Sequence, residues 1–157
     1  MSDVNLPELL GFNEVANMSV PEIRVLIGHI EELAKTGEPL EIPVKHHFSS
    51  GVYAREMKVP KGALIVGKIH KKQNLNIISQ GEVSVLSIDG IIRVKAPHTF
   101  VAGEGVKRVI YAHEDAVWST IHGTHETDLE KIEEEFIAKT YEELPLTVDV
   151  ALIESKE

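Results

Sequence analysis

The sequence predicts a mainly β domain, a sandwich or barrel, with an α-helix at each end. Between residues 39 and 122, short runs rich in Val, Ile and aromatic residues are separated by six turn signals. This pattern is typical of all-β domains rather than of βαβ units. Capping signatures near residues 19 and 127 precede apolar residues at helical spacing. With 157 residues, the chain is long enough for one domain with a real core.

The first helix is expected to begin after Ser19. Ser19 is a suitable N-cap, Pro21 falls in the first turn, and Glu22 follows the cap by three residues. Gly37 predicts the end of the helix. Apolar residues recur between them at helical spacing: Ile23, Leu26, Ile27, Ile30 and Leu33. This apolar stripe needs a surface to cover, either on its own barrel or on a neighbouring copy. Residues 1–18 are expected to be irregular, with a short helical turn around residues 6–10.

Asp89-Gly90 is the strongest hairpin signal in the chain. The flanking runs, VSVLSI at 83–88 and IIRVKA at 91–96, both alternate apolar and polar residues. Such alternation is typical of strands with one buried face. We therefore expect two paired strands here.

A second capping box, Thr127 to Glu130, predicts the start of an acidic C-terminal helix that ends at Pro145. Its apolar stripe is Leu129, Ile132, Phe136 and Ile137. The run LTVDVALI at 146–153 is expected to form an edge strand or to contact a partner. We expect a helical extension at 1–38, the β-barrel at 39–122, and a helix and tail at 123–157, together forming one structural domain.

The stretch GALIVGKIHKKQNLNIISQG has the spacing of a metal-binding motif with altered residues. Gly62, Lys68, His70, Asn74 and Gly81 match G-x5-H-x-H-x3-E-x6-G without a gap. By this spacing and its run of short strands, the chain resembles the cupin superfamily. Its fold is a double-stranded β-helix, a small jelly-roll barrel. The resemblance covers residues 45–122.

The second cupin motif, G-x5-P-x-G-x2-H-x3-N, matches this chain only at its first two defined positions. Gly90 begins it and Pro97 comes one residue late. Counted from Pro97, Thr99 stands at the Gly place, Ala102 at the His place and Val106 at the Asn place. The segment 98–122 also looks similar to small cupin-like proteins of tailed bacteriophages.

The resemblance implies a metal held by three histidines and one carboxylate, of which this chain keeps only His70. Lysine is cationic, asparagine is a weak neutral ligand, and alanine offers no donor atom. Divalent metal sites need three or four convergent donors, so we expect no metal and no cofactor. If a metal is bound, His70 and His98 are its candidate ligands, because His98 is near the lost position of the second motif.

Without a metal, the same region can form a polar pocket. Alternation along residues 63–70 places Lys68 and His70 on one face, and the resemblance implies that this face is interior. Asn74 and Asn76 are expected on the facing strand. An ammonium, an imidazole and two amides favour a small anionic or hydroxyl-rich, sugar-like ligand. The candidate ligand-binding residues are Lys68, His70, Asn74, Asn76, His98 and Arg108.

Three function classes remain open. The first is a non-enzymatic binding or assembly module, and the second is a cupin-type enzyme, metal-dependent or similar to metal-free sugar-nucleotide epimerases. In the epimerase-like case His70, Lys68 and Tyr111 would act together, although no Asp is placed to orient His70. The third is a cyclic-nucleotide-type binding domain, because the segment 100–108 partly resembles a phosphate cassette that ends in Arg108.

The composition limits which partners, which chemistry and which cellular location we expect. The net charge is −9, which disfavours nucleic-acid binding. There is no cysteine, and therefore no disulfide or thiolate chemistry. No apolar run is long enough to span a membrane, and the first residues do not resemble a secretory signal. We expect a cytoplasmic homodimer, or one in the host cytoplasm if the chain is phage-encoded.

Overall fold

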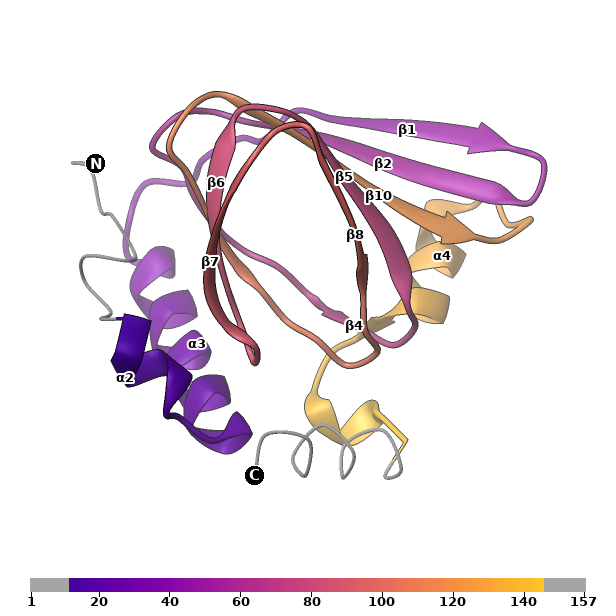
Figure 1. Cartoon of the computed structure of the whole chain (residues 1–157). Helices are drawn as coiled ribbons and strands as arrows, with labels where there is room; N and C mark the ends of the chain where they lie inside the picture. The colour runs from indigo at the N-terminus through magenta and orange to yellow at the C-terminus, as the bar shows by residue number, and fades with distance from the viewer. Residues whose placement is uncertain (1–11, 146–157) are drawn as a thin grey trace.

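The computed structural model, which describes residues 12–145, contains two antiparallel β-sheets that curve around a common interior (Figure 1). The five-stranded sheet has the order β1 (Val44–Ser49), β2 (Val52–Val59), β10 (Ala116–Gly123), β5 (Asn74–Gln80), β8 (His98–Ala102). The four-stranded sheet has the order β3 (Leu64–Val66), β9 (Val109–Ala112), β6 (Glu82–Ser87), β7 (Gly90–Lys95). This architecture confirms the predicted mainly β jelly-roll barrel.

The remaining elements lie outside the two sheets. They are α2 (Phe12–Ala16), α3 (Val20–Lys35), α4 (Leu129–Phe136), the 3₁₀ turn η1 (Tyr141–Glu143), and a small pair formed by β4 (Ile69–His70) and β11 (Ile137–Ala138). Among the described residues, no helix has both the length and the apolar character needed to cross a bilayer.

The predicted first helix is confirmed as α3. The Ser19 Oγ accepts a hydrogen bond of 3.3 Å from the Glu22 N–H, and the Glu22 side chain accepts one of 3.3 Å from the Ser19 N–H. These two bonds satisfy donors that a helix start otherwise leaves unpaired. The helix ends at Lys35, with Thr36 as its C-cap.

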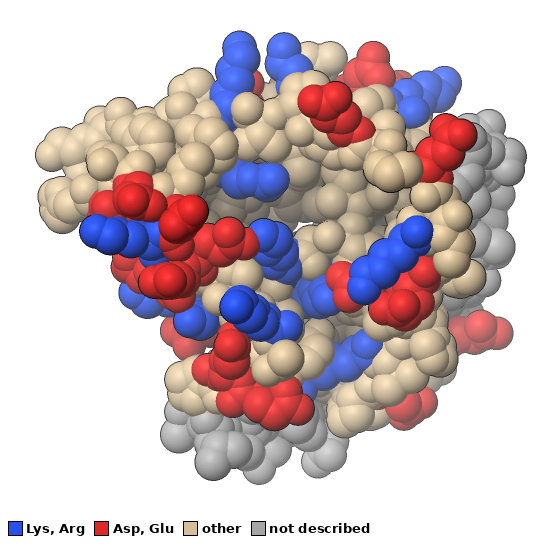
Figure 2. Space-filling view, turned by 180° about the vertical axis from the view of Figure 1, so that it is seen from behind, with Lys and Arg blue, Asp and Glu red and all other residues tan. Residues whose placement is uncertain are grey.

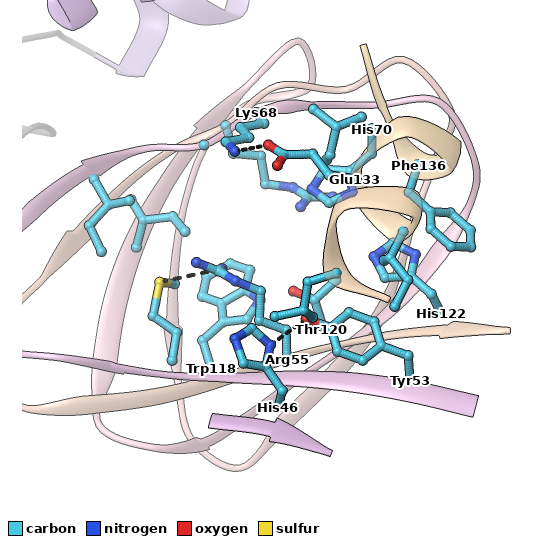
Figure 3. Close-up of a pocket in the computed structure, with 18 of the residues that line it drawn as sticks. His46, Tyr53, Arg55, Lys68, His70, Trp118, Thr120, His122, Glu133 and Phe136 are labelled. Atoms are coloured by element: carbon cyan, nitrogen blue, oxygen red, sulfur yellow. Dashed lines mark hydrogen bonds and ion pairs between the residues drawn. The ribbon is translucent and has the colours of Figure 1, made fainter. Parts of the chain in front are cut away.

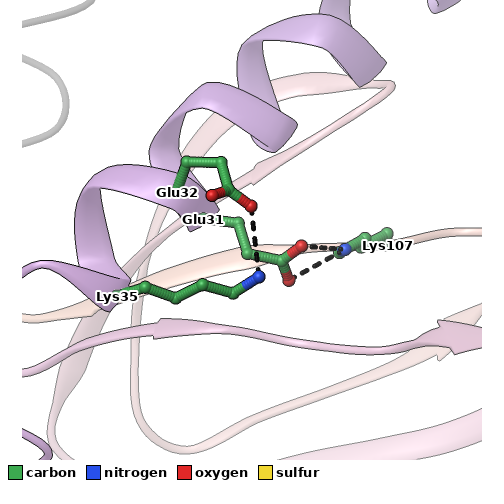
Figure 4. A network of polar contacts seen from close by, with 4 residues as sticks. All are labelled: Glu31, Glu32, Lys35 and Lys107. Atoms are coloured by element: carbon green, nitrogen blue, oxygen red, sulfur yellow. Dashed lines mark hydrogen bonds and ion pairs between the residues drawn. The ribbon is translucent and has the colours of Figure 1, made fainter.

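The apolar face of α3 covers the chain's own barrel. Helix α3 lies on the outer side of the four-stranded sheet (Figure 1). Ile23 and Ile27 are fully buried and pack with Leu86 and Val109. Burying such side chains contributes about 1.5–3 kcal/mol each. Lys107, just before β9, adds hydrogen bonds of 3.0 and 3.1 Å to the Glu31 carboxylate (Figure 4).

Alternation along β6 divides the core into two parts. Val83 and Val85 point into the barrel, where they pack with Ile78 and Trp118 from the opposite sheet. Leu86 instead belongs to the cluster beneath α3. The hairpin predicted at Asp89-Gly90 is present, with β6 and β7 paired antiparallel. One face of β6 therefore packs in the barrel interior, and the other face packs against α3.

The predicted C-terminal helix is corrected in both its start and its end. The N-cap is Asp128, whose side chain accepts hydrogen bonds from the next turn, and not Thr127. The helix ends at Phe136, well before Pro145, because the next two residues are extended and pair with β4. The expectation of irregular chain before Ser19 is wrong for Phe12–Ala16, which form α2. The sequence signals at 6–10 and 146–153 lie outside the described residues.

Candidate functional site

A cavity of about 400 Å³ lies between the two sheets and beneath α4 (Figure 3). Its apolar lining is Met57, Ile65, Val66, Ile110, Trp118, Leu129, Ile132, Phe136 and Ile137. Its polar and charged lining, together with the backbone of Gly67, is His46, Tyr53, Arg55, Lys68, His70, Arg108, Thr120, His122 and Glu133. The volume is within the range of ordinary small-molecule sites.

The strand predicted through residues 63–70 is interrupted at this cavity. β3 ends at Val66 and pairs with β9, whereas β4 starts at Ile69 and pairs with β11. The Gly67 N–H donates a hydrogen bond of 2.8 Å to the carbonyl oxygen of Arg108. Lys68 is therefore exposed at the rim of the cavity instead of lying in a continuous strand.

Three cationic side chains line the cavity, from three different parts of the chain. Arg55 comes from β2, Lys68 from the break between β3 and β4, and Arg108 from the segment before β9. The only carboxylate among the lining residues is Glu133, which forms an ion pair with Lys68. No carboxylate of residues 12–145 forms an ion pair with Arg55 or Arg108. Figure 2 shows basic side chains gathered in and around a hollow on one face of the molecule.

Both arginines have other neighbours. The Arg108 guanidinium lies over the Phe100 ring at 5.4 Å from its centroid, and burial lowers the pKa of this group. The Arg55 Nη1 lies 4.0 Å from Met57 Sδ. Neither contact neutralises a charge, so both guanidiniums keep hydrogen-bonding capacity for an anion.

Helix α4 forms one wall of the cavity and is held there by two lysines and by its buried apolar face. Lys72 pairs with Glu135 at 3.1 Å, and the Lys71 ammonium donates to the Glu134 carbonyl oxygen at 2.8 Å. The inner face of α4 contributes Ile132 and Phe136, both buried. Exposed ion pairs contribute little to stability, so these apolar contacts supply most of the attachment.

Four rings are arranged face to face along another side of the cavity. The centroid of Tyr53 lies 5.9 Å from that of His46 and 6.4 Å from that of His122. The His122 ring in turn lies 5.5 Å from His70, with 16° between the ring planes. The Tyr53 hydroxyl and His46 Nδ1 share a hydrogen bond of 2.7 Å, and burial raises the pKa of Tyr53. Figure 3 shows this arrangement beside α4.

The two stacked histidines are neutral at pH 7. Burial, with smaller effects of His122, Arg108, Arg55 and Lys68, lowers the pKa of His70 to about 4. Burial also lowers the pKa of His122, against an opposing effect of Glu135. The Nδ1 atoms of both rings are buried and have no hydrogen-bond partner among residues 12–145.

Of the six residues predicted to bind a ligand, three line the cavity. These are Lys68, His70 and Arg108. His98 lies on β8 beside Phe100, with ring centroids 5.6 Å apart, and does not line the cavity with His70. The ring that meets His70 is that of His122.

Asn74 and Asn76 are buried, but their amides are used inside the protein. The Asn76 Oδ1 accepts hydrogen bonds from Trp118 Nε1 at 2.9 Å and from Thr120 Oγ1 at 3.0 Å. The Asn76 Nδ2 donates to Asn74 Oδ1 at 2.7 Å. These two residues therefore support the wall that carries Trp118 and do not face the cavity.

Sequence reasoning did not identify Arg55 or His122 as site residues. A signal existed for Arg55, because alternation along β2 places it on the same face as the buried residues Tyr53 and Met57. Arg55 itself is exposed, but a charged residue on a strand face that is otherwise buried is a candidate functional group. His122 occupies an equivalent place on β10, where Trp118 is also buried.

No protein-family model matches the chain, and no curated protein matches it. Among solved structures, a salicylate 1,2-dioxygenase variant from Pseudoaminobacter salicylatoxidans is similar at a TM-score of 0.51 and 8% identity, over 72% of this chain and 35% of that one. The Cnp3 cupin domain of Schizosaccharomyces pombe is similar at 0.47 and 19%, over 65% and 76%. A cupin-2 protein from Shewanella frigidimarina is similar at 0.43 and 14%, over 61% and 92%.

The chain has a cupin-like jelly-roll fold. The dioxygenase variant is only 8% identical to this chain, so that likeness shows the fold alone. None of these comparisons supports the predicted likeness to bacteriophage proteins.

The residues at the cupin metal-ligand positions of this chain do not form a site for the metal that the resemblance implies. Asn74 and Ala102, which stand at the Glu and second-motif His places, are cross-strand partners on β5 and β8, so the two places are still adjacent. The asparagine is hydrogen-bonded to Asn76 and the alanine has no donor atom. Within residues 12–145, no three His, Asp or Glu side chains are grouped as metal ligands.

Proposed function

We propose that this protein binds a small organic anion in the cavity between its sheets, and that it acts as a non-enzymatic cupin-type binding module. The observation that carries the proposal is the charge of the lining. Arg55, Lys68 and Arg108 face the cavity with a single carboxylate, that of Glu133, in a chain whose net charge is −9. A charge-assisted hydrogen bond from arginine to a carboxylate is among the stronger polar contacts in proteins.

The state of the histidines supports binding over acid–base catalysis. A general base normally needs a partner that orients its ring. Within the described residues, the buried Nδ1 of His70 has no such partner. A cyclic-nucleotide cassette is also less well supported, because residues 103–108 form a turn and irregular chain instead of a short helix.

Isothermal titration calorimetry at pH 7 with phosphate, acetate, hexanoate, phenylacetate and gluconate tests the proposal. We expect at least one carboxylate to bind with a Kd below about 1 mM. Changing Arg55→Gln together with Arg108→Gln should weaken that binding about 100-fold or more, since two bonds are lost and each bond to a charged group contributes about 1.5–3 kcal/mol.

Arg93→Gln is the matched control. Arg93 is exposed on β7 and pairs with Glu82 outside the cavity, so its loss removes one guanidinium without altering the site. Unchanged affinity in the double variant, or no binding by any of the five anions, would overturn the proposal.

A further inference from the structure

The charged residues of the cavity lie toward the solvent. Of the four Arg, Lys and Glu residues in the lining, Arg55, Lys68 and Glu133 are exposed and Arg108 is half-buried. Exposed residues in the lining of a cavity mark its opening. The mouth of this cavity is therefore its cationic end.

The inner end of the cavity is formed by apolar side chains from both sheets. Ile65 and Ile110 are cross-strand partners on β3 and β9, and both pack with the cluster inside the barrel. Met57 joins this cluster from β2 of the other sheet. All three residues line the cavity, so a ligand that extends inward from the mouth meets methyl, methylene and thioether groups.

Ile65 points into the barrel and still keeps accessible surface. Its neighbours Leu64 and Val66 pack with the cluster beneath α3, whereas Ile65 packs with the interior cluster. Ile65 is nevertheless only half-buried, and it lines the cavity. Its exposed part therefore faces the cavity, where an apolar ligand group can cover it. Removing such surface from water is favourable.

We propose that the ligand is an amphipathic monocarboxylate, bound with its apolar tail inward and its carboxylate at the mouth. The tail packs against Ile65, Ile110 and Met57. The carboxylate contacts Arg55 or Arg108. A dicarboxylate would carry a second charge into the apolar end, and a sugar acid would bury hydroxyls there without partners. The inference rests on the proposed function and specifies the class of anion.

A series of straight-chain acids tests the direction of binding. Calorimetry at pH 7 with acetate, butyrate, hexanoate and octanoate should show an affinity that rises about two- to fourfold per methylene until the tail fills the cavity. Adipate has the length of hexanoate and a second carboxylate at the far end. It should bind at least about tenfold more weakly than hexanoate.

Ile65→Thr should lower the affinity for hexanoate about fourfold or more, because it replaces apolar surface of the inner end with a hydroxyl. Ile92→Thr is the matched control. Ile92 is exposed on β7 and does not line the cavity, so this variant should bind hexanoate as the wild type does. Equal affinities in the two variants would contradict contact between the tail and Ile65.

Proton NMR of the wild-type complex gives a readout that needs no variant to fold. The terminal methyl of hexanoate should show nuclear Overhauser contacts to the methyl groups of Ile65 or Ile110, and the methylene next to the carboxylate should not. The reverse pattern would overturn the inference. Affinity that is independent of tail length, but still depends on Arg55 and Arg108, would also overturn it and leave the proposed function standing. Absence of binding by all these acids would overturn both.

Discussion

Lys68 and Glu133, which are 65 residues apart in the chain, form an ion pair at the rim of the cavity. The contact holds the pKa of the Glu133 carboxyl below its usual range, because Lys68 donates a hydrogen bond to it. The same ion pair engages Lys68, one of the three cationic side chains that line the cavity. Glu133 therefore competes with any anionic ligand for Lys68.

Glu133→Gln should strengthen anion binding. The change removes the only carboxylate in the lining and frees the Lys68 ammonium, so we expect the affinity for a bound carboxylate to rise about threefold to tenfold. Calorimetry measures it. Glu134→Gln, one residue along α4, alters the net charge equally without altering the lining, and should have little effect. Equal gains in both variants would contradict a local role for Glu133.

Acidification should destabilise the folded protein through His70. Its pKa is about 4 in the folded state against 6.5 for the ordinary group, so the unfolded chain takes up the proton first. The free energy of unfolding then falls as the pH drops from about 6.5 toward 4. A shift of this size corresponds to about 3 kcal/mol at most, and His122 acts in the same direction.

Urea unfolding between pH 7 and pH 4.5 measures how steeply the free energy of unfolding falls with pH. His70→Asn should reduce this slope. His29→Asn, at an exposed position of α3, should not. The folded state also lowers the pKa of Glu82, Glu126 and Glu133, but these acids contribute to the change of stability with pH only below about pH 5.5, where the unfolded chain begins to protonate its carboxylates. A slope that His70→Asn leaves unchanged would contradict the neutral, buried state of this ring.

Asn76→Ala should destabilise the barrel by at least about 2 kcal/mol, because it leaves Trp118 Nε1 buried without an acceptor. Gln80→Ala on the same strand removes an exposed amide and should change stability by less than about 0.5 kcal/mol. Chemical denaturation measures both. Similar values for the two variants would show that the hydrogen bonds of Asn76 are not what stabilises this wall.

Gly81→Ala should be far more damaging than Gly90→Ala. Both glycines have positive φ, 90° and 106°, so both variants are strained. A Cβ on Gly81 would also lie 2.5 Å from the carbonyl oxygen of Asp115 and 2.8 Å from Ala116 Cα, whereas a Cβ on Gly90 meets nothing within 4 Å. We expect a difference of more than about 1 kcal/mol in the free energy of unfolding. Equal losses would contradict the close approach at Gly81.

The elements that sequence reasoning predicts correctly depend on local signals. The cap at Ser19 and the turn at Asp89-Gly90 need only their own neighbours to form. Residue alternation also correctly places Asn76 in the interior. Its hydrogen-bond partner Trp118, however, comes from a strand 42 residues later, so sequence alone could not show that the amide is already used.

The cavity is less predictable because it depends on strand register and on chain breaks. Arg55 stands opposite Thr120 across β2 and β10, a relationship that no local pattern determines. Lys68 was predicted on an interior face but lies at the rim, since the strand breaks where Gly67 bonds to Arg108. The C-terminal helix ends early because Ile137 pairs with His70. Each of these is a tertiary contact that overrides a local preference.

A crystal structure of the protein with its tightest-binding carboxylate would show directly where the anion binds. We expect a carboxylate between the sheets, with an oxygen within about 3.2 Å of a guanidinium nitrogen of Arg55 or Arg108. An anion bound on the outer surface, with no contact to either arginine, would contradict this expectation.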